Sequence, residues 1–303
     1  MQFHHILMCI LIILAIAILC YTIYKSWKRS VEGFGGFDQT ESFLLKTGAN
    51  CYDDFYVNKY DELMDSKRET VKQADLIIQT VPIEKETDRI LDIGAGTGTM
   101  VKYLASLGYK AEGLEISDIM IQKSIEKYRV ISMTQGNALD PMQYDRGTFT
   151  HILCTNFTIY EFVNKLQLLE NCHSWLQGNG YLIIHLVDRD EFLPIIPAAL
   201  NENPDISIDE SRITETEIDF IGYTYKSIYD FIKGSPEVYH KETFVDIKTG
   251  NIRQNERTLQ MEDHREILEM AVKSGFSVKG HIPLENLGSP KKDQWLFILE
   301  RTL

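Results

Sequence analysis

A glycine-rich segment followed by a distant acid is the part of the sequence best suited to hold a ligand. Residues 90–99 read Ile-Leu-Asp-Ile-Gly-Ala-Gly-Thr-Gly-Thr, so an apolar run ends at Asp92 and three glycines alternate with small residues. Because glycine lacks a Cβ, a ligand can lie against the backbone of such a turn, next to the N–H groups of a helix start. A second such run ends at Glu115, whose carboxylate can accept two hydrogen bonds from a ribose diol. The spacing predicts a site for an adenosine-containing ligand.

The spacing of the glycines separates two classes of adenosine ligand. A dinucleotide site requires Gly-x-Gly-x-x-Gly, and here the third glycine comes one residue early. The pattern Asp92-x-Gly94-x-Gly96-x-Gly98 resembles motif I of the class I S-adenosylmethionine-dependent methyltransferases, and the resemblance covers roughly residues 52–301. It implies an α/β fold with a doubly wound, mostly parallel sheet of seven strands whose last strand is antiparallel. It also implies S-adenosylmethionine as the cofactor, S-adenosylhomocysteine as the product, and no metal.

Alternating apolar strands and amphipathic helices must position the glycine turn. In a doubly wound sheet, ligands bind beyond the carboxyl ends of the strands, at the point where the strand order reverses. We expect strands at 90–93, 111–115, 130–133, 149–157, 181–187, 275–278 and 295–300. We expect helices at 52–60, 61–79, 100–107, from 117 or 118 to 128, from the end of the fourth strand through 175, and at 264–274.

The resemblance implies a set of cofactor-binding residues at these strand ends. The acid that contacts the adenine amino group in the family is replaced here by Asn137, whose carbonyl oxygen can still accept a hydrogen bond. Asp140 is an alternative partner for adenine. The cofactor-binding candidates are Asp92, Gly94, Ala95, Gly96, Gly98, Glu115, Ile116, Asn137, Ala138, Thr155 and Asn156.

Catalysis by such a protein requires alignment of a nucleophile with the cofactor's methyl group and exclusion of water. A dedicated base is optional, because an amine acceptor can lose its proton beforehand. If a base is used, the candidates by position are Tyr160, Glu161 and His185, although a lone histidine on a strand is more often a satisfied core residue. The histidines are scattered and lack the spacing of a metal-ligand set.

Two segments are candidates for covering the acceptor. Tyr52, Tyr56 and Tyr60 recur every four residues and would lie on one face of a helix, either as part of the core or, as the resemblance implies, over the cofactor. After the fifth strand, residues 189–262 contain β-like stretches and resemble an antiparallel insertion that closes over substrate. Tyr56, Tyr60 and Tyr223 are therefore the substrate-binding candidates. An excess of acids in the insertion indicates either a solvated face or attraction for a cationic amine.

The amino terminus differs in composition from the rest. Residues 6–24 contain no charge and are long enough, at about 29 Å as a helix, to span a bilayer. A signal peptide fits less well, because no basic residue precedes the run and no cleavage site follows it. Basic residues directly after the run place the large domain in the cytosol. We expect a single-pass anchor over 1–29, a flexible tether over 30–50 and a methyltransferase domain over 51–303.

The sequence thus predicts a membrane-tethered methyltransferase acting on an N or O nucleophile of a small-molecule or lipid-like acceptor. A net charge of −13 disfavours a nucleic-acid substrate. One alternative is an NAD(P)-dependent oxidoreductase, against which the glycine spacing and the terminal helix-and-hairpin pattern argue. The other is a tethered protein that binds S-adenosylmethionine without catalysis.

Overall fold

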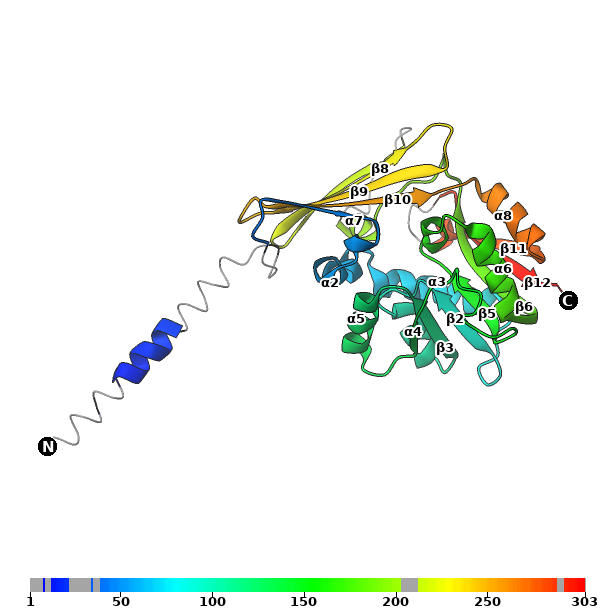
Figure 1. Cartoon of the computed structure of the whole chain (residues 1–303), viewed down its shortest axis with the longest axis horizontal. Helices are drawn as coiled ribbons and strands as arrows, with labels where there is room; N and C mark the ends of the chain where they lie inside the picture. The colour runs from blue at the N-terminus through cyan, green and yellow to red at the C-terminus, as the bar shows by residue number, and fades with distance from the viewer. Residues whose placement is uncertain are drawn as a thin grey trace. The chain divides into compact units, whose positions relative to one another are not determined.

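The computed structural model describes residues 8, 12–21, 34, 39–202, 212–287 and 292–302 (Figure 1). The chain divides into two compact units. The smaller unit comprises Met1–Leu45, Glu217–Lys226 and Glu242–Gln254, and the larger comprises Lys46–Thr216, Ser227–Lys241 and Asn255–Leu303.

The larger unit is built on a seven-stranded sheet in the order β11-β12-β6-β5-β2-β3-β4. Strands β2 to β6 pair in parallel, whereas β12 runs antiparallel to both β6 and β11, which confirms the predicted reversed last strand. The strand order reverses between β2 and β5, so a crevice forms beyond their carboxyl ends. The bounds are β2 Arg89–Ile93, β3 Lys110–Glu115, β4 Met133–Gln135, β5 Phe149–Cys154, β6 Leu176–Val187, β11 Phe276–Pro283 and β12 Gln294–Arg301.

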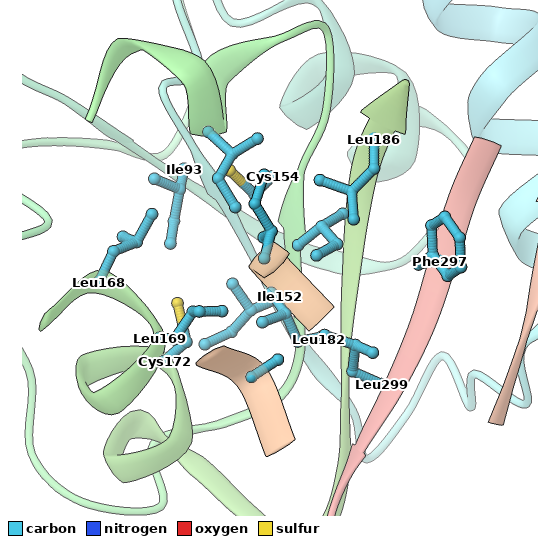
Figure 2. Close-up of a cluster of buried hydrophobic side chains, with 14 of the residues drawn as sticks. Ile93, Ile152, Cys154, Leu168, Leu169, Cys172, Leu182, Leu186, Phe297 and Leu299 are labelled. Atoms are coloured by element: carbon cyan, nitrogen blue, oxygen red, sulfur yellow. The ribbon is translucent and has the colours of Figure 1, made fainter. Parts of the chain in front are cut away.

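Helices cover both faces of this sheet, because successive strand residues point to opposite faces. Leu91, Ile152 and Leu182 pack on one face with α6 (Lys165–Trp175) and α8 (His264–Lys273); Figure 2 shows part of this cluster. On the other face, the strand neighbours of these residues pack with α3 (Ser66–Thr80) and α4 (Thr99–Ser106). Each buried aliphatic side chain contributes about 1.5–3 kcal/mol. The remaining helices are α2 Asp54–Leu63, α5 Asp118–Tyr128 and α7 Pro197–Glu202, with short 3-10 turns η1 Gly48–Cys51, η2 Thr158–Glu161 and η3 Leu284–Leu287.

Helix boundaries follow local capping chemistry. Of the two starts left open for α5, at 117 or 118, the structure has Ser117 as the cap, whose side chain accepts the Met120 N–H. The helix expected over 61–79 instead begins at Ser66, because Asp65 adopts a left-handed conformation with φ 42° and separates α3 from α2.

Several strand predictions differ from the structure in their bounds. Strand β4 begins at Met133, three residues later than expected, and β6 begins at Leu176, directly after α6. Within the insertion expected over 189–262, residues 215–231 form two strands, since Gly222 with φ 96° allows a tight turn between them.

A second sheet has five strands in the order β1-β10-β9-β8-β7. Its first strand, β1, lies within the segment 30–50 that the sequence predicted as a flexible tether, so that prediction is wrong for these residues. A strand of five residues that pairs with β10 has no local signal that reveals its partner. The bounds are β1 Phe43–Thr47, β7 Glu215–Phe220, β8 Tyr223–Phe231, β9 Glu237–Asp246 and β10 Ile252–Gln260.

The amino-terminal apolar run is described only in part. Residues 12–21 are helical, and the rest of the predicted anchor over 6–24 lies outside the described residues. Within the part of the chain that the structure describes, no helix has both the length and the hydropathy needed to cross a bilayer.

Candidate functional site

A cavity opens at the carboxyl ends of the central strands in the larger unit. Its floor is the end of β2 and the glycine turn, and its walls come from α2, α3, the segment after β5, and the ends of β6 and β12. The lining residues are Tyr60, Met64, Ser66, Glu69, Thr70, Asp92, Gly94, Ala95, Thr97, Thr99, Met100, Thr155, Asn156, Phe157, Thr158, His185, Leu193, Ile195, Pro197 and Gln294.

The three glycines of the turn differ in the space around them. All have positive φ, namely 67° at Gly94, 54° at Gly96 and 75° at Gly98. A Cβ on Gly94 or Gly98 would lie 2.5 or 2.4 Å from a neighbouring side chain, so close packing excludes one there. At Gly96 the nearest atom would be Cε1 of Tyr60, at 3.8 Å. That distance is ordinary van der Waals contact, so at Gly96 the positive φ, rather than close packing, favours glycine.

Glu115 at the end of β3 holds the turn in place. Its two carboxylate oxygens accept the N–H groups of Gly96 at 2.8 Å and Ser117 at 2.9 Å. Each oxygen keeps a lone pair, so the group can also accept the two hydroxyls of a ribose. Burial raises the pKa of Glu115. Burial, with a smaller effect of the Glu115 charge, raises the pKa of Asp92 to about 8. These residues fit the nucleoside part of S-adenosylmethionine.

The other predicted adenine contacts surround this end of the sheet without lining the cavity. Ile116 is 65 % exposed directly after Glu115, so its side chain offers an apolar surface. The Asn137 side-chain oxygen accepts the Leu139 N–H at 2.9 Å. Ala138 is buried, and its carbonyl accepts a hydrogen bond from the Asn171 side chain.

The segment after β5 is strained where it meets the cavity. Asn156 and Phe157 are consecutive non-glycine residues with positive φ, 53° and 67°. Such strain is costly and concentrates at functional sites. The Asn156 side-chain oxygen accepts a hydrogen bond from the Gln73 side chain at 2.9 Å, and Thr155 beside it is buried.

Of the three candidate bases, one lines the cavity. His185 on β6 is buried there, with its ring 4.7 Å from that of Phe157. The hydroxyl of Tyr160 instead accepts the Val187 N–H, and burial raises the pKa of this phenol. Glu161 accepts a hydrogen bond from the Tyr52 hydroxyl at 2.7 Å, outside the cavity lining.

The tyrosines near α2 contact one another edge to face, so they lie on one side of the helix as the four-residue spacing predicted. The ring centroids of Tyr52 and Tyr56 are 5.7 Å apart, and those of Tyr56 and Tyr60 are 6.1 Å apart. Tyr60 lines the cavity, whereas the Tyr56 hydroxyl accepts a hydrogen bond from Arg257. Tyr223, the third substrate-binding candidate, is buried in the smaller unit with its ring 5.0 Å from that of Phe220, and it is not a lining residue.

One carboxylate attaches α2 to the glycine turn. Asp61 accepts hydrogen bonds from the Thr97 hydroxyl at 2.6 Å and from the Lys127 ammonium at 2.5 Å. Tyr60 directly precedes Asp61, so these contacts also hold the Tyr60 ring next to Gly96.

A polar face of α3 was missed by the sequence reasoning. Ser66, Glu69, Thr70 and Gln73 follow helical spacing, and all four are buried, between 1 % and 9 % exposed. The first three line the cavity. Helices of globular proteins normally bury apolar residues at this spacing, so a buried polar face indicates a polar ligand. A signal for this burial was present in the sequence: one turn later, the same face of the helix carries apolar residues of the kind that helices bury.

A second missed residue is Gln294, at the start of β12. Its side chain is 4 % exposed and lines the cavity, and among the described residues its Oε1 has no hydrogen-bond partner. A buried amide oxygen without a partner is costly, so a ligand hydroxyl or N–H group would satisfy it. Apolar Leu193, Ile195 and Pro197 complete this wall.

Comparison with known proteins identifies the family. A family described as "Methyltransferase domain" matches residues 64–223, which is more than half of the chain and includes the glycine turn, Glu115 and most of the cavity lining. The chain belongs to the methyltransferase domain family. No curated protein matches the sequence significantly. Among the described residues, no group of three or more His, Cys, Asp or Glu is placed to hold a metal ion.

Solved methyltransferases share the fold of this family member. The CcbJ methyltransferase from Streptomyces caelestis superposes with a TM-score of 0.62 at 14% identity, covering 82% of this chain and 96% of that one. CalS10, an amino pentose methyltransferase from Micromonospora echinaspora solved with S-adenosylmethionine bound, gives 0.58 at 18% identity, covering 84% and 100%. The sugar N-methyltransferase KedS8 from Streptoalloteichus gives 0.55 at 17% identity, covering 82% and 92%.

Proposed function

We propose that this methyltransferase transfers the methyl group of S-adenosylmethionine to an amine nitrogen of a small polar molecule. The observation that carries the proposal is the cavity itself. One part of its lining is the glycine turn, whose Gly96 N–H bonds to Glu115, and another part is the buried polar face of α3. A nucleoside and a polar acceptor therefore have separate surfaces within one enclosure.

The charge of the lining supports a cationic ligand. Glu69 lines the cavity and pairs with Lys72 at 3.7 Å, while the described lining residues include no lysine or arginine. Bound S-adenosylmethionine supplies an activated methyl group on a positively charged sulfur. Amine acceptors are also basic, and two structurally similar proteins are an amino pentose methyltransferase and a sugar N-methyltransferase. We therefore favour nitrogen over oxygen as the nucleophile.

The chain's own residues then have distinct tasks. Glu115 and the Gly96 backbone bind the nucleoside, and Ser66 and Thr70 orient the acceptor through their hydroxyls. His185, buried beside the acceptor wall, takes the proton that the amine loses. The apolar residues after β6 exclude water from the reacting groups.

Calorimetry and transfer assays test this function in sequence. We expect binding of S-adenosylmethionine and S-adenosylhomocysteine, and none of NADPH. Incubation with methyl-labelled S-adenosylmethionine and a cell extract should then label a small-molecule fraction, with the label on nitrogen. NADPH binding would instead favour an oxidoreductase, and binding without transfer would indicate a non-catalytic protein. Label in lipid, in macromolecules or on oxygen would refute the acceptor class.

We also propose that residues 6–24 anchor the enzyme in a membrane with the large domain in the cytosol. The uncharged length of this run and the basic residues after it support the proposal. Retention of the full chain in the membrane pellet after alkaline carbonate extraction is the expected result. Added protease should digest the large domain on intact cytosol-outward membranes. Release by carbonate would refute the anchor, and protection from protease would refute the orientation.

A further inference from the structure

We propose that one end of the five-stranded sheet rests on the lipid surface, and that Ile221 and Ile247 are its contact residues. This inference rests on the proposed membrane anchor and adds a second, separate membrane contact. It concerns the smaller unit alone.

Two neighbouring turns present these isoleucines to solvent. Ile221 lies between β7 and β8 and is 97 % exposed, and Ile247 lies after β9 and is 62 % exposed. The turns touch each other, because the Ile247 N–H donates to the Gly222 carbonyl at 3.1 Å. Single exposed apolar side chains are common, but here two large ones project from adjoining turns. An exposed apolar pair of this kind suits insertion into a membrane interface.

The chain that follows the apolar run is fastened to this same end of the sheet. The Phe34 N–H donates to the carboxylate of Asp246, at the end of β9, and the Phe34 side chain is buried. The Asn251 side chain donates to the Gln39 carbonyl at 2.7 Å. The turn between β9 and β10 is therefore where the amino-terminal segment joins the fold.

The length of chain between anchor and sheet sets how far apart they can be. The apolar run ends at Tyr24, and Phe34 follows ten residues later. Ten residues reach at most about 36 Å when fully extended. If the run spans a bilayer, the turn end carrying Ile221 and Ile247 cannot be farther than this from the membrane interface. A lipid surface is accordingly the occupant that chain length favours.

The test uses the full chain reconstituted in phosphatidylcholine vesicles. Cys9→Ala and Cys20→Ala remove the cysteines of the apolar run, and the other three are buried. A polarity-sensitive fluorophore is attached through Ile221→Cys, or in the matched control through Val130→Cys, an equally apolar position of the larger unit that is 81 % exposed. Flotation of each labelled chain with the vesicles is measured first, and quenching by lipids carrying a nitroxide near the headgroup second.

We expect both chains to float, and lipid nitroxide to remove most of the emission from position 221 and little of that from 130. Failure to float would overturn the anchor and this inference together. Flotation without quenching at 221 would overturn the inference and leave the anchor standing. Equal quenching at both positions would show indiscriminate adhesion. If the label reports an apolar environment without being quenched by the lipid nitroxide, and the chain forms a larger oligomer, the surface would contact a second copy of the chain instead of lipid.

Discussion

The two walls of the cavity are built in different ways. The cofactor wall lies between residues 92 and 115 and relies on backbone conformation and one carboxylate. The acceptor wall joins α3 to Gln294, more than 200 residues away, and relies on side chains alone. A wall made from a continuous segment carries a recognisable sequence pattern. A wall assembled from distant side chains carries none, and it can change specificity one residue at a time.

Glu115→Ala should have the largest effect, because it breaks the cofactor wall. Loss of two hydrogen bonds to a charged acceptor, each worth about 1.5–3 kcal/mol, should weaken S-adenosylmethionine binding about 100-fold or more. Isothermal titration measures this. Glu115→Gln keeps the shape and part of the acceptor capacity, so we expect it to bind with intermediate affinity. Wild-type affinity in the alanine variant would place the ribose elsewhere.

Thr70→Val should break the acceptor wall and spare the cofactor wall. The substitution keeps the volume of a buried lining residue and removes its hydroxyl. We expect kcat/KM for the amine acceptor to fall about tenfold, with affinity for S-adenosylmethionine unchanged. Thr80→Val is the matched control, since Thr80 is exposed at the end of the same helix and should have no effect. Equal loss of binding and transfer in Thr70→Val would mean that α3 belongs to the cofactor wall.

Asp92→Asn should change how the stability of the cofactor wall depends on pH. The folded state raises the pKa of Asp92 from 3.8 to about 8, so the folded protein binds more protons than the unfolded chain between these values. The stability that this carboxyl provides is complete below pH 3.8 and is lost as pH rises through about 8. Asp92→Asn should therefore raise Tm by about 3 °C or more near pH 9. At about pH 5 the increase in Tm should be smaller. Scanning calorimetry at both pH values checks this, and exposed Asp145→Asn should show no such dependence.

Asp263→Ala should have the smallest effect and no influence on either wall. Asp263 caps α8 by accepting the Arg265 N–H at 2.8 Å. Loss of a cap costs about 1 kcal/mol, or about 2–4 °C in Tm for a chain of this size. Chemical denaturation measures the cost, and titration should give wild-type affinity for S-adenosylmethionine. A changed affinity would mean that the α8 face of the sheet is coupled to the cavity.

The sequence predicted the elements whose signals are local. The glycine turn, the end of β3 and the Ser117 cap each depend on a few consecutive residues, and the structure confirms their positions. The resemblance to the methyltransferase family implied the reversed last strand, and the antiparallel pairing of β12 with β6 confirms it. Strand β1 could not be predicted, because its only strand neighbour, β10, begins about 200 residues later.

The buried face of α3 shows why the rest of the site was not predicted. In the sequence, Ser66, Glu69, Thr70 and Gln73 have the spacing of a solvated helix face, and Val71 is an apolar residue of the same helix. The structure buries the polar set against the cavity and leaves Val71 only half-buried. Hydrophobic periodicity assumes that every buried face is apolar, and a ligand cavity reverses that assumption.

The attachment of α2 through Asp61 has a consequence for the speed of the enzyme. Tyr60, which lines the cavity, belongs to a helix that one carboxylate fastens at both Thr97 and Lys127. In many enzymes the opening of an element beside the bound ligand, rather than the chemical step, limits turnover. We therefore expect the residence time of S-adenosylhomocysteine, and with it the susceptibility of the enzyme to inhibition by its own product, to be set at Asp61, remote from any atom that reacts.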